Sequence, residues 1–188
     1  MGSYYYLMAQ LPYLIYEQKP PMSSENFKEL AQSLLNKSDA VYLDYLTLNP
    51  VKTNEGATGC SFIDNWREWD NALRLNLAKE RAIKLKRESE ISTPPLFPLE
   101  ASAAASKAVD EHSPLDGETV IDKARWNAID ALAGNDYFHR NTVYAYYLKL
   151  LLIERREAFN LEKGFDEYKS LYASILESAQ KNSLGEPK

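Results

Sequence analysis

The sequence predicts an all-α protein, a multi-helix bundle of two helical halves joined by a proline-rich connector. Only seven glycines occur among the 188 residues. Val, Ile and Thr are sparse beside Leu, Ala, Glu and Lys, so intrinsic propensity favours helix along most of the chain. Apolar residues also recur every three to four positions in several segments, as they do on the buried face of an amphipathic helix.

The N-terminal half is assigned to residues 1–88. Its opening segment, residues 4–16, is rich in Tyr and Leu and is interrupted by Pro12. Proline removes a backbone donor and breaks a helix interior, so a long element is excluded here. A short helix and a short strand both remain open interpretations of this segment.

Two helices are expected next. Ser23 or Ser24 can cap the first, whose apolar residues repeat at helical spacing. These residues are Phe27, Leu30, Ala31, Leu34 and Leu35. Ser38 or Asp39 can cap the second, and Asn49–Pro50 ends it because a residue before proline avoids the helical region.

A long helix is predicted over residues 61–88, with Ser61 as its expected N-cap. Its aromatic and aliphatic residues fall on one stripe, namely Phe62, Trp66, Trp69, Leu73 and Leu77. Acidic residues lie in its first turns and basic residues in its last turns, which complements the helix dipole. The preceding stretch, residues 51–59, is polar and contains two glycines, so it predicts a surface loop.

The connector is assigned to residues 89–118. Three prolines exclude a helix interior between residues 94 and 98. Residues 101–109 are rich in alanine and compatible with a short helix, whereas residues 112–118 contain Pro, Asp and Gly and predict a turn. Whether the two halves pack as one body or move about this connector remains open.

The C-terminal half is assigned to residues 119–183 and predicts three helices. The first begins at Thr119 as its cap and ends near Gly134. The second opens at Asn141 or Thr142 and carries a wide apolar face.

The last helix is expected over residues 166–181, after Gly164 as a break in helical structure. Its apolar pattern is amphipathic and consists of Phe165, Tyr168, Leu171, Tyr172, Ile175 and Leu176. Residues 184–188 are expected to fray, as chain ends do when nothing holds them.

Charge and targeting features argue against several classes of protein. A formal net charge of −5 and a pI near 5.2 disfavour nucleic acid or anionic lipid as the main partner. Every apolar run is broken by charge well before the roughly 20 residues of a membrane helix. The N-terminus lacks the basic and apolar regions of a secretion signal. Cys60 stands alone, which indicates a reducing compartment. We therefore expect a cytoplasmic protein.

Catalytic and metal-ligating residues are not gathered into a motif. The two histidines, His112 and His139, stand outside any ligand spacing, so neither a metal nor a cofactor is expected. Cys60 precedes a helix, where a thiol can become nucleophilic, but a small residue at the edge of a loop is the favoured interpretation. Residues 56–59 lack the Lys-Ser/Thr of a phosphate-binding loop. The sequence therefore predicts a protein that is not an enzyme and has no small-molecule substrate.

Basic residues and tyrosines are the candidates for partner binding. The basic residues gather at the end of the 61–88 helix and include Arg81, Lys84 and Arg87. They can meet phosphate or an acidic partner, while a solvated helix end with dipole-favoured cations is the alternative. The 13 tyrosines suit surfaces that are buried only in a complex, and packing at the edge of the core is the alternative for them.

Three stretches carry a pattern of aromatic and aliphatic residues, namely residues 4–12 (YYYLMAQLP), 69–82 (WDNALRLNLAKERA) and 146–156 (YYLKLLLIERR). Together they resemble a bacterial family of uncharacterised proteins encoded within V/A-type ATPase operons. That family occupies the operon place of the C subunit, the all-α socket that joins the central rotor stalk to the membrane ring, and its helical pattern is similar to that protein. The socket is built from three similar helical units and this chain has material for one or two, so a complete funnel is not implied.

The resemblance implies a non-catalytic component of a rotary ATPase, similar to the C subunit, that transmits torque between the stalk and the membrane ring. Its partners would be protein subunits, and it would meet the membrane only peripherally, through the complex. The residues implied to grip these partners are Arg81, Lys84, Arg87, Arg155 and Arg156, with Tyr5 and Tyr146 as anchors.

Two other classes remain as alternatives. The first is a free-standing helical adaptor or assembly factor that uses the same residues on an unrelated protein. The second is an enzyme, whose minimum signature would be an apolar pocket that contains His139 beside Asp136 or Glu154.

Overall fold

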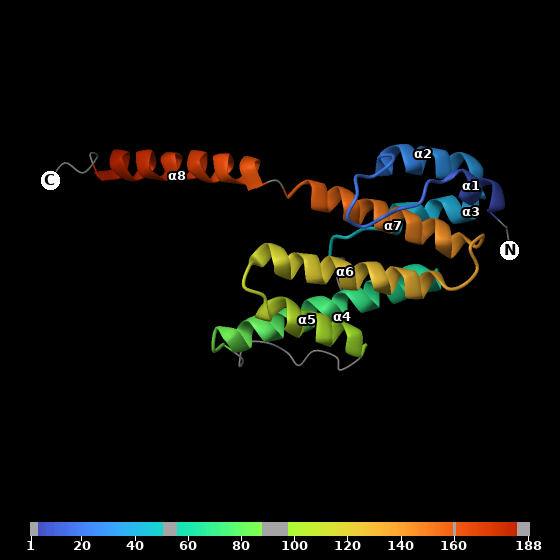
Figure 1. The fold of residues 1–188 in the computed structure, drawn as a ribbon, viewed down its shortest axis with the longest axis horizontal. Coiled ribbons are helices and arrows are strands. Elements are labelled where there is room, and N and C mark those ends of the chain that lie inside the picture. The colour runs from blue at the N-terminus through green and yellow to red at the C-terminus, as the bar shows by residue number, and fades with distance from the viewer. Residues whose placement is uncertain (1–3, 51–55, 88–97, 160, 184–188) are drawn as a thin grey trace. The chain divides into compact units, whose positions relative to one another are not determined.

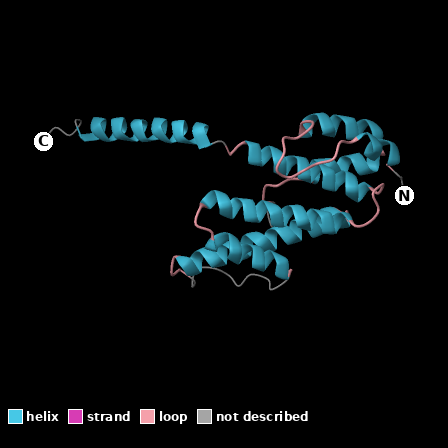
Figure 2. Cartoon of the chain, in the orientation of Figure 1, coloured by secondary structure: helices cyan, strands magenta, loops and turns pink. Residues whose placement is uncertain are grey.

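The computed structural model describes residues 4–50, 56–87, 98–159 and 161–183. Throughout these ranges the regular structure is helical and no strand is present, as Figure 2 shows, so the all-α prediction is confirmed. The chain divides into two compact units, Met1–Glu154 (unit 1) and Arg155–Lys188 (unit 2). The boundary lies within a helix and not in the proline-rich connector.

The elements follow one another along the chain in a simple order (Figure 1). They are α1 Tyr5–Gln10, α2 Ser24–Leu34, α3 Lys37–Ala40, the 3-10 helix η1 Val41–Tyr45, α4 Ser61–Lys84, α5 Leu99–Asp110, α6 Pro114–Ala133, α7 Arg140–Glu157 and α8 Leu161–Ser183. The segment of residues 4–16 therefore forms a short helix, α1, which ends before Pro12.

One of the two early caps is confirmed and the other is wrong. The Ser23 hydroxyl accepts a hydrogen bond from the N–H of Asn26 at 3.1 Å and caps α2. The next helix begins at Lys37 with Asn36 in the N-cap position, so Ser38 and Asp39 lie inside it. Asp39 is unavailable as a cap because its carboxylate is used in tertiary contacts.

The start of α4 lies at the predicted residue, but Cys60 and not Ser61 occupies the N-cap position. The side chain of Cys60 accepts no hydrogen bond from the backbone N–H groups at the start of the helix. Asp64, in the first turn, instead accepts hydrogen bonds from the backbone N–H and the hydroxyl of Thr58, both at 2.8 Å. Cys60 lies at the edge of the loop, as predicted, and is fully buried in the core.

The turn predicted at residues 112–118 is wrong beyond its first residues, because α6 begins at Pro114. Ser113 caps this helix by accepting a hydrogen bond from the N–H of Leu115, and proline is favoured at the first helical position. Gly117 is helical because α5 passes close by: a Cβ atom here would lie 2.7 Å from the carbonyl oxygen of Ala108. Thr119 is therefore not the cap.

The remaining helix ends differ from the predictions by small to moderate shifts. The alanine-rich stretch forms α5, and α6 ends before Gly134, which has a φ of 75°. α7 begins at Arg140, one residue before Asn141. α8 begins at Leu161 and contains Gly164 within its helical span, so Gly164 is not a break. The tail predicted to fray, residues 184–188, lies outside the described residues.

Unit 1 draws its core from both expected halves. A first cluster joins side chains of α1, α2, η1, the start of α4 and α7, with Ile129 of α6 among them. A second cluster fills the space between α4, α5 and α6, which lie side by side in Figure 1. Trp69 packs against both clusters and so connects them. The two halves therefore pack as one body up to Glu154.

Unit 2 contains the last residues of α7 and the whole of α8. The N–H of Phe159 donates a hydrogen bond to the carbonyl oxygen of Arg156 at 3.0 Å, just after the end of α7. α8 is 23 residues long, and every residue of it whose side chain is described is exposed.

Candidate protein-binding surfaces

The apolar residues of α8 form a continuous exposed stripe, which we call the α8 face. It consists of Phe165, Tyr168, Leu171, Tyr172, Ile175 and Leu176, each between 46% and 63% exposed. At 100° per residue these six positions cover an arc of about 140° around the helix. An apolar stripe of this width on a helix in water normally packs against other protein, so the α8 face is a candidate binding surface.

The aromatic residues of the α8 face are ordered against their neighbours on the same helix. The rings of Tyr168 and Tyr172 stack with their centroids 6.2 Å apart and an interplanar angle of 19°. The ammonium nitrogen of Lys169 lies 4.2 Å from the centroid of the Phe165 ring. Aromatic side chains held in this way provide large contact areas at low cost in conformational entropy.

The basic set of unit 1 lies where α4 ends. Lys86 adopts a left-handed conformation with a φ of 57°, and the N–H of Arg87 donates to the carbonyl oxygen of Ala82 at 2.8 Å. This is the pattern of a Schellman motif, and it ends the helix at Lys84, four residues before the predicted end. Residue 88, the predicted end itself, lies outside the described residues.

The three cations of this end differ in their contacts. Arg81 and Arg87 are exposed. The ammonium group of Lys84 donates a hydrogen bond to the carbonyl oxygen of Val109 at 2.6 Å and so ties α4 to the end of α5. Lys84 therefore has a structural contact in addition to any role toward a partner.

The other two predicted cations lie in unit 2. Arg155 and Arg156 occupy the last turn of α7 and are partly buried. The guanidinium carbon of Arg155 lies 5.5 Å from the centroid of the Phe159 ring. The five predicted cations are therefore divided between the two units.

The two predicted tyrosine anchors differ in exposure. Tyr146 is only 8% exposed, its ring lies 5.0 Å from that of Phe27, and its hydroxyl donates to the carbonyl oxygen of Pro12 at 2.9 Å. Burial raises the pKa of Tyr146 to about 12. Tyr146 is a core residue, so the alternative of packing at the core edge applies and its role as an exposed anchor is wrong. Tyr5 is 62% exposed and available.

Sequence reasoning missed the aromatic neighbours of Tyr5. The rings of Tyr5 and Phe138 lie 4.8 Å apart, and the N–H of Tyr4 donates to the carbonyl oxygen of Phe138 at 2.8 Å. Tyr137, the residue before Phe138, is strongly exposed. The sequence does show two adjacent aromatic residues in the loop after Gly134, which could have indicated a binding surface. Nothing in the sequence near them, however, indicated that they pack against α1.

A buried polar network around Asp39 joins the N-terminus to α7. Tyr4 donates its hydroxyl proton to Asp39, and Arg140 Nη1 lies 2.9 Å from the same carboxylate. The hydroxyl of Tyr144 donates to the backbone carbonyl of Asp39 at 2.9 Å. Burial disfavours the charged carboxylate, but the hydrogen bonds from Tyr4 and Arg140 outweigh it and lower the pKa of Asp39. Tyr4, Arg140 and Tyr144 each make a hydrogen bond to Asp39, which is the arrangement of a structural site.

A second buried network connects α4 and α6. Arg125 donates to Asp70 at 2.9 Å and to Asp122 at 3.2 Å, and all three side chains are buried. Arg74 binds the other oxygen of Asp70 at 2.6 Å and the carbonyl oxygen of Leu48 at 2.6 Å. A buried charge is tolerated when it is paired and hydrogen-bonded in this way, so these four residues stiffen the α4–α6 contact.

The three residues named for the enzyme alternative, His139, Asp136 and Glu154, each accept a hydrogen bond from a nearby or packed segment of the chain. His139 accepts a hydrogen bond from the N–H of Asn141 at 3.3 Å, and Asp136 accepts one from the N–H of Phe138 at 3.1 Å. Glu154 lies 14 positions after Arg140 along α7, which places it about 20 Å from the start of that helix. It binds Ser24 instead. His139 lies beside Asp136 in one turn, where its N–H donates to the carbonyl oxygen of Asp136 at 3.3 Å, whereas Glu154 is held at Ser24.

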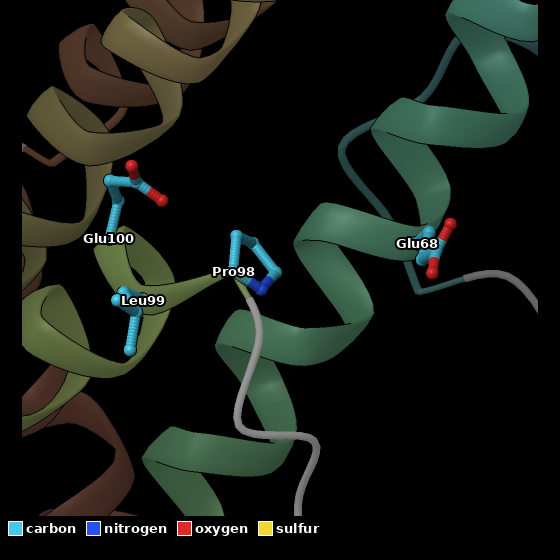
Figure 3. A pocket seen from close by; sticks show the side chains of 4 residues that line it. All are labelled: Glu68, Pro98, Leu99 and Glu100. Carbon is cyan, nitrogen blue, oxygen red and sulfur yellow. The ribbon is translucent and has the colours of Figure 1, made fainter.

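One pocket of about 430 Å³ lies between α4 and the start of α5 (Figure 3). Its lining consists of Glu68, Pro98, Leu99 and Glu100. Figure 3 shows Glu68 on α4 and the other three residues at the beginning of α5. Two carboxylates and two apolar side chains give this pocket a negative charge, which disfavours an anionic ligand.

Metal and membrane features are absent from the described part of the chain. No three His, Cys, Asp or Glu residues within it are grouped as a metal site requires. None of the helices in the same ranges combines the length and the apolar composition that crossing a bilayer demands.

Comparison with models of protein families identifies a match to part of the chain. The model of a family described as a protein of unknown function (DUF2764) matches residues 104–178. The matched region begins within α5, contains α6 and α7, and includes all six residues of the α8 face. No curated protein and no solved structure matches the chain.

Proposed function

We propose that this chain is a non-catalytic protein that binds other proteins, and that it acts between the central stalk and the membrane ring of a V/A-type rotary ATPase, as the C subunit does. The exposed α8 face is the observation that carries the binding role, because an apolar surface of this width is costly to leave in water. The identity of the partners rests on the resemblance of residues 4–12, 69–82 and 146–156 to the family from V/A-type ATPase operons.

Torque transmission requires a body that does not deform under load. Two core clusters that share Trp69 and the buried ion pairs of Arg125 support this role for unit 1. Buried, fully paired networks of this kind fix the relative positions of the helices that they join. No bond is made or broken in such a role, and the chain would reach the membrane only through its complex.

Charged contacts would add specificity to the apolar contact. Arg81 and Arg87 are exposed at the end of α4 and can meet an acidic partner surface. Arg155 and Arg156 are the corresponding candidates in unit 2. Exposed charges at the rim of an interface mainly alter association rate and partner choice, so we expect smaller effects from them than from the α8 face.

Affinity purification from the native host tests the proposal. The chain is expressed from its own locus with an N-terminal tag, membranes are solubilised in mild detergent, and the eluate is analysed for stalk and ring subunits. We expect both to be enriched with the wild-type chain, and we expect Arg81→Glu with Arg87→Glu to reduce their recovery. Enrichment of unrelated proteins alone would contradict the rotary-ATPase assignment and favour a free-standing adaptor. A genomic locus without rotary-ATPase genes would also count against it.

A further inference from the structure

We infer that the α8 face binds in a groove between two neighbouring helices of a partner protein, an inference that deepens the protein-binding role proposed above and rests on it. The partner is defined here by its shape and chemistry: a helical surface whose groove is lined by apolar side chains. The width of the α8 face, its area and the charge of α8 all point to this kind of partner.

The width of the α8 face exceeds what one helix can cover. Phe165, Tyr168, Tyr172 and Ile175 follow one another at spacings of three, four and three residues, which is the seam of a two-helix contact. Leu171 and Leu176 lie on opposite sides of this seam and widen it to the arc of about 140°. A groove between two helices contacts the seam and both flanks, as in other complexes where an amphipathic helix lies in a groove.

The exposed area of the α8 face is adequate for a specific interface. Six side chains, each about half exposed, present roughly 600 Å² of surface if about 100 Å² is assigned to each. A matching area on the partner gives roughly 1,200 Å², the lower end of the range for stable protein complexes. A second copy of α8 would cover the seam alone and would leave Leu171 and Leu176 of both copies in water.

The charge of α8 favours protein over lipid as the occupant. The helix contains four acidic and three basic residues, so its polar side is close to neutral. Helices that lie on anionic membrane surfaces carry polar sides rich in Lys and Arg. The α8 face has the aromatic content of such a helix but lacks its positive charge.

Photo-crosslinking in the native host tests this inference on the full-length chain. The photoreactive amino acid p-benzoylphenylalanine is placed at Tyr168 or Tyr172 on the face, and at Ser170 or Ser174 on the opposite side as matched controls. Because all four positions are exposed, we expect unchanged far-UV circular dichroism in every variant. We expect both face probes to label one and the same partner protein, with labelled peptides in two different helices of it. The control probes should label it at least about tenfold less.

A second substitution checks that the apolar contact is responsible. Leu171→Glu in the chain that carries the probe at Tyr172 should reduce labelling at least about tenfold, whereas Glu167→Gln should leave it unchanged. Labelling of a second copy of this chain, of lipid, or of residues 1–154 of the same chain would overturn the inference. Failure of the face probes to label any partner would also overturn it.

The outcomes separate this inference from the proposed function. If the labelled helices belong to a protein outside the rotary ATPase, the groove-docking inference stands and the rotary-ATPase assignment falls. If stalk and ring subunits are recovered with the chain while the α8 probes label none of them, the assignment stands and the groove-docking inference falls.

Discussion

Glu154 of α7 caps the beginning of α2 from 130 positions away, because its carboxylate accepts hydrogen bonds from the backbone N–H and the hydroxyl of Ser24, both at 2.6 Å. A negative charge at a helix N-terminus is stabilising. Glu154→Ala should therefore lower the free energy of unfolding by about 1–2 kcal/mol, and Glu154→Gln should lower it less. Urea unfolding followed by tryptophan fluorescence measures this, since all three tryptophans lie in unit 1. If the Glu154→Ala variant had the same free energy of unfolding as the wild type, the contact with Ser24 would contribute nothing to stability.

The Schellman motif at the end of α4 predicts a stabilising substitution. Lys86 has a φ of 57°. This left-handed conformation is energetically unfavourable for a residue with a Cβ atom but not for glycine. Lys86→Gly should raise the free energy of unfolding by about 0.5–1 kcal/mol. Lys79→Gly, the same change in the interior of α4, should lower it by a similar amount. If both substitutions changed the free energy of unfolding in the same direction, the left-handed conformation of Lys86 would be contradicted.

Gly117 should not tolerate alanine, although alanine is the better helix former. A Cβ atom at this position would lie 2.7 Å from the carbonyl oxygen of Ala108, so α5 and α6 would have to separate. Gly117→Ala should lower the free energy of unfolding by about 1–3 kcal/mol. Gly164 is a matched control, because a Cβ atom placed there would meet no atom within 4 Å and Gly164→Ala should increase the helicity of α8. Circular dichroism with urea unfolding measures both variants.

The lowered pKa of Asp39 makes part of the stability dependent on pH. The folded state binds this proton more weakly than the unfolded chain, whose aspartates titrate near about pH 4. The contribution of the charged Asp39 is therefore fully present above about pH 4 and is lost as the pH falls through the folded-state pKa. Asp39→Asn should lower the free energy of unfolding by about 2–4 kcal/mol at about pH 7, because Arg140 and Tyr4 lose a charged partner.

The difference between the wild type and Asp39→Asn should then shrink in acid. Urea unfolding at about pH 7 and at about pH 3 gives the two values. Asp44→Asn removes an exposed carboxylate that pairs with Lys28 and should change stability little at either pH. A difference for Asp39→Asn that stays constant with pH would show that Asp39 is protonated or uncoupled in the folded protein.

Local signals explain which parts of the fold were predictable. The helix at Ser23 follows from a capping residue and an apolar repeat that lie within a few residues of each other. The start of α6 was missed because the turn-like composition of residues 112–118 is overridden by tertiary packing of Gly117 against Ala108. Asp39 has the composition of a cap, but its partners Tyr4 and Arg140 lie 35 and 101 positions away. Such partners cannot be identified from spacing along one chain.

The candidate surfaces also show which features local sequence signals can predict and which depend on tertiary packing. Periodicity predicted that Phe165, Tyr168 and Ile175 share one face of a helix, but it could not tell a face buried in the chain's own core from an exposed one. Tyr146 lies on a similar apolar pattern in α7 and is buried. Exposure depends on which elements pack nearby, and that information becomes available only with the fold.

Hydrogen exchange of the backbone amides of α8 tests the central claim, that the α8 face is a protein-binding surface, most directly. The apolar side chains of α8 are exposed, and an isolated amphipathic helix is only marginally stable in water, so its amides should exchange rapidly in the free chain. In the complex purified through the tagged chain, we expect amides of residues 168–176 to exchange at least about 100-fold more slowly. Equal exchange rates for these amides in the free chain and in the complex would contradict the claim.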